Sequence, residues 1–150
     1  MKAKYVQSIF CLVIFFFFAN LAWSEEWVFY SKSSDGNMYY DKNSIEELGQ
    51  NIVRVKTKTI LNDKGKTDAF SFLKKMGIKA CDRNAISYEL TVEQYDCENK
   101  KYKNISTTIY DQKDNVLLGQ KAIVGSWSDI RPKSIAGKLK NMVCKASKKK

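Results

Sequence analysis

The sequence predicts an α+β fold, in which an antiparallel β-sheet is covered on one side by a C-terminal α-helix. Residues 52–61 alternate between valine or threonine and basic side chains, the pattern of a strand with one buried and one wet face. Ile135, Leu139, Met142 and Val143 fall on one helical face. The last segment can therefore pack on the sheet as an amphipathic helix.

The N-terminus has the features of a cleaved secretory signal. Lys2 and Lys4 precede an apolar run at residues 9–19, and two small residues lie two positions apart before the expected cleavage after Ser24. The run is shorter than the roughly 18 residues that span a bilayer. We therefore expect export, with no transmembrane segment once the signal is removed.

The chain divides into three expected segments. These are a signal peptide at residues 1–24, a single domain at residues 25–146 and a disordered basic tail at residues 147–150. Cys11 lies inside the apolar run and not just after it, so no lipid anchor is expected. Removal of the signal takes away two lysines and no acids, which lowers the formal net charge of +10 by two.

This basic charge biases the choice of partner. A cationic exported protein is attracted to anionic surfaces such as lipid head groups, lipopolysaccharide or sulfated glycans, and salt weakens the attraction. Only three of the 26 basic residues are arginines, whereas planar recognition of bases and phosphates favours arginine. The expected partner is therefore a protein or an anionic surface polymer, without specific nucleic-acid binding.

The first half of the domain is predicted to form three strands. Residues 27–32 and 38–41 flank a loop of turn-forming residues and predict a β-hairpin. The half-buried strand at residues 52–61 follows, with its valines and threonines on one face. We expect this strand to end in a turn at residues 62–65.

Two helices are predicted. Residues 67–77 form the first, with Thr67 or Asp68 as its N-cap and Gly77 as its C-terminal stop. The closing helix has Ser134 as its N-cap.

Residues 86–97, 102–110 and 116–124 predict three consecutive antiparallel strands, because short turns connect them. Tyr95 and Cys97 break the alternation of the first of these strands, which indicates a bulge or twist after Val92. The expected apolar face carries Ile86, Tyr88, Leu90 and Val92, and the opposite face carries Ser87, Glu89, Thr91 and Glu93.

The residues that usually carry catalysis are scarce. The chain has no histidine, which removes the commonest general base and the commonest neutral metal ligand. It has no phosphate-binding glycine loop and no C-x-x-C motif. We therefore expect no catalytic residue, no cofactor and no metal site, and an enzyme that uses carboxylates or Cys81 is the weaker alternative.

Arg54, Lys56 and Lys58 form a basic row that is the candidate contact for an anionic partner. The favoured interpretation is a solvated strand face whose charges pair with Glu89 and Glu93 on a neighbouring strand. The many aromatic residues are expected to serve packing, in preference to forming a stacking platform for single-stranded nucleic acid.

Three cysteines remain after removal of the signal, namely Cys81, Cys97 and Cys144. In an exported protein two of them are expected to pair and one to remain unpaired. The residues alone leave all three pairings open, although the loop-entropy model gives more stability to the link from Cys97 to Cys144 than to that from Cys81 to Cys97.

The order of several short motifs resembles the surface-adhesin protein E-like domains of Gram-negative bacteria. Those motifs are Trp27, YYD at 39–41, VRV at 53–55, YDC at 95–97, YD at 110–111, W-x-D-I-x-P-x-S-I from Trp127, and VC at 143–144. The resemblance implies a sheet of about six strands with the C-terminal helix packed on it, and a non-catalytic surface or periplasmic protein that can be a homodimer. It also implies a disulfide between Cys97 and Cys144, which leaves Cys81 as a free thiol.

The leading hypothesis is a secreted, non-enzymatic binding module in the periplasm or at the cell surface, which binds a protein or an anionic partner. The alternative is a periplasmic inhibitor or envelope scaffold with no adhesive role.

Overall fold

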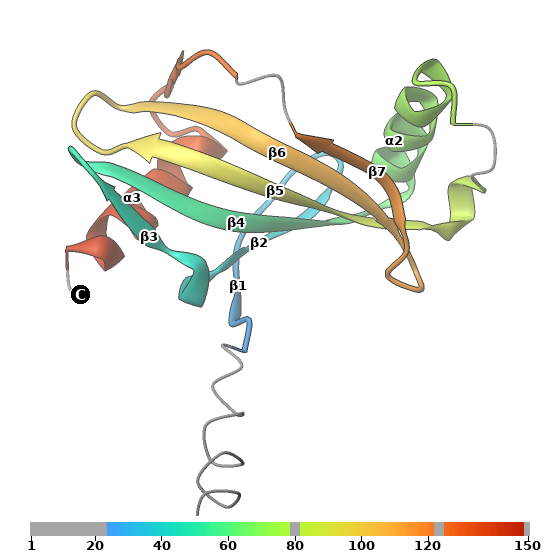
Figure 1. Ribbon diagram of the computed structural model, residues 1–150, viewed down its shortest axis with the longest axis horizontal. Helices are drawn as coiled ribbons and strands as arrows, with labels where there is room; N and C mark the ends of the chain where they lie inside the picture. Colours follow the sequence, from blue (N-terminus) through green and yellow to red (C-terminus); the bar gives the residue numbers. More distant parts are fainter. Residues whose placement is uncertain (1–23, 79–81, 122–124, 149–150) are drawn as a thin grey trace, which may run out of the picture.

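The structure is a computed structural model that describes residues 24–78, 82–121 and 125–148 (Figure 1). The expected signal peptide, apart from Ser24, lies outside the described residues, as do Cys11 and Cys81. Within the described part of the chain, no helix is long and apolar enough to cross a membrane.

Eight strands of the described chain form one sheet. Two of them are short: β3 (Glu46–Gly49) pairs with β4, and β8 (Ser128–Asp129) pairs with β6. The six main strands correspond to the six predicted ones, and the α+β fold class is confirmed. In sheet order, with all neighbours antiparallel, they are β1 (Trp27–Lys32), β2 (Gly36–Asp41), β4 (Ile52–Leu61), β5 (Ile86–Asp96), β6 (Lys101–Asp111) and β7 (Val116–Lys121).

The pairing of β4 with β5 defines the two faces of the sheet. Residues directly opposite each other in an antiparallel pair point to the same side. Val53 lies opposite Tyr95, whereas Lys56 lies opposite Val92. We call the side of Val53 and Tyr95 the inner face, and the side of Lys56 and Val92 the outer face.

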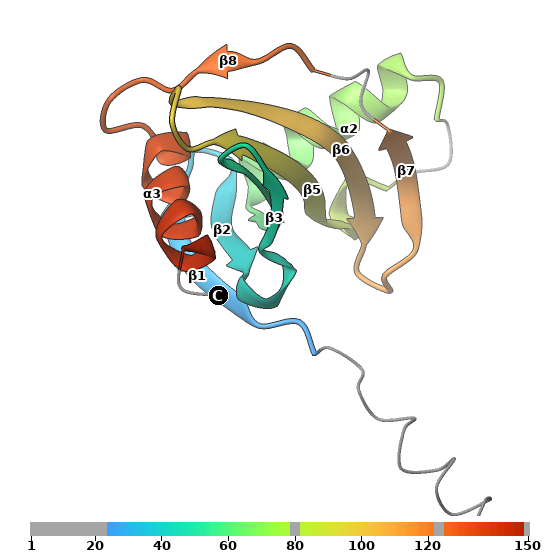
Figure 2. The same cartoon turned by 60° about the vertical axis from the view of Figure 1, so that its left-hand side comes forward.

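One end of the inner face is covered by α3 (Ile135–Ser147). Figures 1 and 2 show this helix at the opposite end of the sheet from α2. Ser134 caps this helix as predicted, because its hydroxyl accepts a hydrogen bond from the Gly137 amide at 3.1 Å. The predicted apolar stripe of the helix is its buried face. The core here contains Tyr30, Ile45, Val53, Val55, Tyr95, Leu139, Val143 and Cys144.

The helix α2 (Asp63–Lys75) covers the other end of the inner face and packs on a second core. The expected turn at residues 62–65 is wrong, because Asn62 is the N-cap of this helix and its side chain accepts a hydrogen bond from the Gly65 amide at 2.9 Å. Gly77 stops the helix as predicted, in a left-handed conformation with φ of 80°. The second core contains Leu61, Ala69, Leu73, Ile86 and Ile109.

The predicted faces of β5 are wrong. Its pairing with β4 is regular from Tyr88 to Asp96, and it places Glu89, Thr91 and Glu93 on the inner face with Tyr95. The reason is a register irregularity between Ile86 and Tyr88, which puts Ile86 on the inner side and the next apolar residues on the outer side. The predicted irregularity after Val92 is present, and its extra residue lies on β6.

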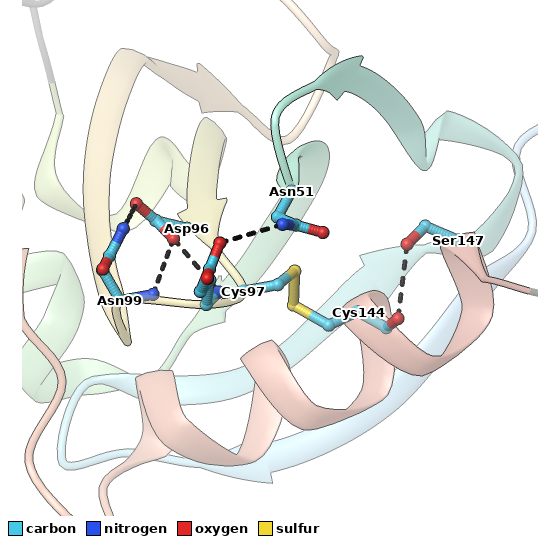
Figure 3. Close-up of a disulfide and its surroundings, with 7 residues drawn as sticks. Asn51, Asp96, Cys97, Asn99, Cys144 and Ser147 are labelled. Atoms are coloured by element: carbon cyan, nitrogen blue, oxygen red, sulfur yellow. Dashed lines mark hydrogen bonds between the residues drawn. A yellow bond between two sulfur atoms is a disulfide. The ribbon is translucent and has the colours of Figure 1, made fainter.

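A disulfide joins Cys97, just after β5, to Cys144 in the last turns of α3 (Figure 3). This is the pairing that the resemblance implies, and the two Cα atoms are 5.8 Å apart. The backbone amide of Cys97 donates a hydrogen bond to the Asn51 carbonyl at 3.0 Å, and this bond fixes the backbone at Cys97. The end of α3 is therefore tied to the end of the strand that it covers.

The helix continues to Ser147, the first residue of the expected tail. Two 3₁₀ turns, η1 (Lys42–Ser44) and η2 (Arg83–Ala85), complete the described elements.

Replacing Cys97 and Cys144 together by serine should lower the free energy of unfolding by about 4 kcal/mol, because the link closes a loop of 47 residues in the unfolded chain. Denaturant unfolding of the oxidised protein measures the change. Cys81→Ser is the control and should leave the midpoint unchanged. An unchanged midpoint in the double variant would contradict a structural role for the link.

Candidate functional site

The predicted contact residues Arg54, Lys56 and Lys58 lie in one row on the outer face of β4. In the described structure both helices build their cores from inner-face residues of β4 and β5, so neither helix lies over this row. Lys56 is exposed, and none of the salt bridges between described residues involves it.

The expected pairing of this row with Glu89 and Glu93 is wrong. These carboxylates lie opposite Thr59 and Val55, and are therefore on the inner face. The sheet itself separates them from the basic row. The lysines of the row consequently keep their charge available to a partner.

Arg54 is the least available of the three cations. Its guanidinium lies 3.3 Å from the Glu46 carboxylate on β3, and both side chains are substantially exposed. Its Nε atom is buried without a hydrogen-bond partner. Within the row, Lys56 and Lys58 are thus the effective positive charges.

Lys58 lies within a group of aromatic rings that gathers at one end of the outer face. Its ammonium is 4.0 Å from the centre of the Tyr88 ring and 5.6 Å from that of Trp27. Tyr88 in turn stacks on Tyr110 at 4.8 Å. Burial, followed by a hydrogen bond to Asp114, raises the pKa of the Tyr88 hydroxyl to about 12. The rings therefore hold Lys58 in place without neutralising it.

Apolar side chains beside this group are exposed to solvent. Phe29 meets Tyr39 edge to face at 5.6 Å, yet 54% of its surface remains exposed, and Ile60 on β4 is 46% exposed. The expectation that the aromatic residues serve packing holds for Tyr30 and Tyr95, which are core residues. On the outer face the rings pack on one another and leave an open surface.

A second feature is a cleft of about 520 Å³ on the inner face, between α2 and α3. Its floor is the polar middle of the sheet, and its walls come from both helices and from the turn between β1 and β2. We call it the inner cleft. Polar and charged residues that line it include Thr57, Thr59, Glu89, Thr91, Glu93, Asn104, Asp35 and Asp68.

Two carboxyl groups in the inner cleft, those of Glu89 and Glu93, have raised pKa values. Burial raises the pKa of Glu93, and the hydroxyl of Tyr95 donates a hydrogen bond to it at 2.6 Å. Burial and the negative charge of Asp35 raise the pKa of Glu89. Burial and the charge of Glu93 in turn raise the pKa of Tyr95. The cleft can therefore hold a proton on a carboxyl group at a pH where surface carboxyls are ionised.

The acids at the rim of the cleft behave differently. The ammonium of Lys64 lies 2.6 Å from Asp35 and 2.7 Å from Asp68. The hydrogen bonds from Lys64 and Ser34 lower the pKa of Asp35. Lys64 balances one of the two negative charges at the rim, whereas no cation pairs with Glu89 or Glu93 among the salt bridges of the described residues.

The inner cleft was not found by sequence reasoning. A usable signal is the position of Glu93 two residues before Tyr95 and four before Cys97, because alternate residues of a strand share a face. If the inner face of β5 is assigned from Cys97 and not from its apolar residues, alternation places both Glu89 and Glu93 on that face. The free thiol expected at Cys81 falls outside the described residues.

Comparison with known protein families identifies a match over most of the chain. The family model described as Surface-adhesin protein E matches residues 27–145. This range covers the sheet and nearly all of α3. No curated protein sequence matches the chain significantly.

Solved structures with the same fold come from Haemophilus influenzae. A structure of Haemophilus influenzae protein E is 13% identical with a TM-score of 0.55, and the match covers 83% of this chain and 87% of that one. A crystal structure of protein E from non-typeable Haemophilus influenzae is 13% identical with a TM-score of 0.52, covering 81% and 86%. At this identity the likeness establishes a shared fold.

Glu93→Gln should make the protein more stable at neutral pH, by about 1 kcal/mol. A raised pKa means that the folded state binds the proton more tightly, so stability falls as the pH rises from the unfolded pKa of about 4.3 through the folded value. Glutamine keeps an acceptor for Tyr95 and removes the charge.

Urea unfolding between acidic and neutral pH measures this effect. The gain should shrink as the pH falls and vanish once Glu93 is protonated in both states. Glu47→Gln, at an exposed position on β3, is the matched control and should change stability little. A Glu93→Gln variant that is less stable at neutral pH would contradict the assignment.

Proposed function

Because the chain belongs to the surface-adhesin protein E family, we propose that it is an exported, adhesin-like binding module of a Gram-negative cell envelope. It binds its partner without converting it chemically. The partner is a protein with an acidic surface or an anionic surface polymer.

Export is supported by the signal features of residues 1–24 and by the disulfide of the domain. Disulfides form and persist in oxidising compartments such as the periplasm and the cell surface. The mature protein then comprises the domain at residues 25–146 and the short lysine tail at residues 147–150.

The observation that carries the binding function is the outer face of the sheet. It combines cations, among them Lys56 and Lys58 of the row on β4, with exposed apolar side chains, and no described helix covers it. Such a surface both attracts an acidic partner at long range and offers apolar area for close contact. Arg54 supports the face by its pairing with Glu46 and contributes less free charge.

A binding role also fits the chemistry of the chain. It has no histidine, and the inner cleft presents carboxyl, hydroxyl and amide groups among its lining residues.

Reversing both charges, Lys56→Glu with Lys58→Glu, should weaken binding of the mature protein to a heparin fragment at low salt by about tenfold, because the change places like charges opposite the polyanion. Titration calorimetry or surface plasmon resonance measures the affinity. Added salt should weaken the wild-type interaction in the same experiment.

The matched control is Lys75→Glu with Lys145→Glu, which changes the net charge equally at exposed positions on α2 and α3. Its affinity should stay within about twofold of the wild type. An equal loss in both double variants would show a diffuse charge effect and remove the outer face as the binding surface.

A further inference from the structure

A pocket of about 540 Å³ lies where the chain enters α3. It is formed by the turn between β5 and β6, the loop at residues 130–134 and the first turns of α3, and Figure 2 shows this loop leaving β8 and turning into the helix. We call it the α3 pocket. It is lined by Lys100, Ile130, Arg131, Pro132, Lys133, Ser134, Gly137, Lys138, Lys140 and Asn141.

The frame of the α3 pocket is held by the protein's own hydrogen bonds. The amide of Ile130 donates to the Lys100 carbonyl at 2.9 Å, which ties the loop to the β5–β6 turn. The hydroxyl of Ser134 donates to the Arg131 carbonyl at 2.7 Å, which closes the loop onto the helix. A Cβ atom at Gly137 would lie 3.3 Å from Ile130 Cγ2, so the loop and the helix are already in close contact. The pocket is therefore preformed.

The lining is strongly and unevenly charged. Half of the lining residues are cations and none is a carboxylate. None of these five cations takes part in a salt bridge between described residues, whereas Lys42, Arg54 and Lys64 elsewhere on the surface do. Like charges gathered around one hollow repel one another, and a bound anion relieves that repulsion.

Two of the lysines sit in a backbone conformation that glycine adopts more readily. Lys100 has φ of 55° and Lys133 has φ of 60°, both in the left-handed region. Each lowers the folding equilibrium constant by about fivefold relative to a residue without a Cβ. Both lysines line the same pocket, whereas Gln50, Asn51 and Asp114 adopt this conformation elsewhere in the described chain. A glycine at either position would avoid this cost, so the two lysines can be replaced by glycine without loss of stability.

We propose that the α3 pocket binds a phosphate monoester. Such a group carries close to two negative charges and three acceptor oxygens, so it can pair with cations that different segments of the chain supply. Ile130 and Pro132 provide apolar contact for whatever carries the phosphate. The monoester belongs either to a membrane lipid head group or to a soluble compound. This site is separate from the outer face and does not depend on the outer face binding a partner.

The test uses the mature protein with two probes. Inorganic phosphate is titrated against the amide NMR signals, and Gly137 and Lys138 should shift with saturation. Vesicles of phosphatidylcholine with phosphatidic acid, a monoester, are compared with vesicles charge-matched by phosphatidylglycerol, a diester. Preferential binding to phosphatidic acid assigns the monoester to a lipid, and a phosphate response without that preference assigns it to a soluble compound. Absence of both responses overturns the proposal.

The decisive variant is Lys100→Gly with Lys133→Gly. It should weaken binding of the responding probe by on the order of tenfold and at the same time raise the denaturant midpoint, because left-handed strain is removed with the charge. Loss of binding therefore cannot come from unfolding. Gln50→Gly, at φ of 52° away from the pocket, should raise the midpoint without changing binding.

Lys75→Gln with Lys145→Gln removes the same net charge outside the pocket and should leave binding within about twofold. An equal loss in this control, or full binding by the double glycine variant, overturns the proposal. Lys56→Glu with Lys58→Glu separates the two sites, since it should retain the shifts at Gly137 even if the outer face binds nothing.

Discussion

The register between β4 and β5 is the constraint on which the rest of the structure depends. Each residue of β4 from Ile52 to Ile60 has a partner on β5 without interruption. This register determines which residues of both strands lie on the inner face and which lie on the outer face. A shift by one residue would move Val53 and Val55 into solvent and Lys56 into the core. Both helices pack on the side that carries the valines. The basic row stays on the opposite side for the same reason.

The inner face has two cores with a polar middle. Apolar residues occur at both ends of the paired strands, where α3 packs on Val53 and Val55 and α2 packs on Leu61 and Ile86. Between them the strands carry threonine and glutamate, which no described helix covers, and the inner cleft results. The disulfide holds α3 at its own end of the sheet, so the spacing of the two helices, and hence the opening of the cleft, is constrained covalently on one side.

Local patterns predicted most of the fold, and their failures have physical causes. Alternation identified β4 and its basic row, and helical periodicity with a serine cap identified α3. The same reasoning failed for β5, because Tyr88 and Val92 are apolar residues on the open face while Glu93 lies inside with a tyrosine partner. The start of α2 was missed because Asn62 suits a turn and a cap equally well. The clefts depend on where helices pack, which no local pattern contains.

Division of the sheet into a covered inner face and an open outer face is the central claim, and lysine footprinting tests it most directly. The mature protein is acylated under limiting conditions with and without a saturating heparin fragment, and reactivity is read at each lysine by mass spectrometry. Lys56 should react readily in the free protein and become protected in the complex, while Lys75 on α2 stays reactive throughout. Protection of Lys75 with unchanged reactivity of Lys56 would contradict the account.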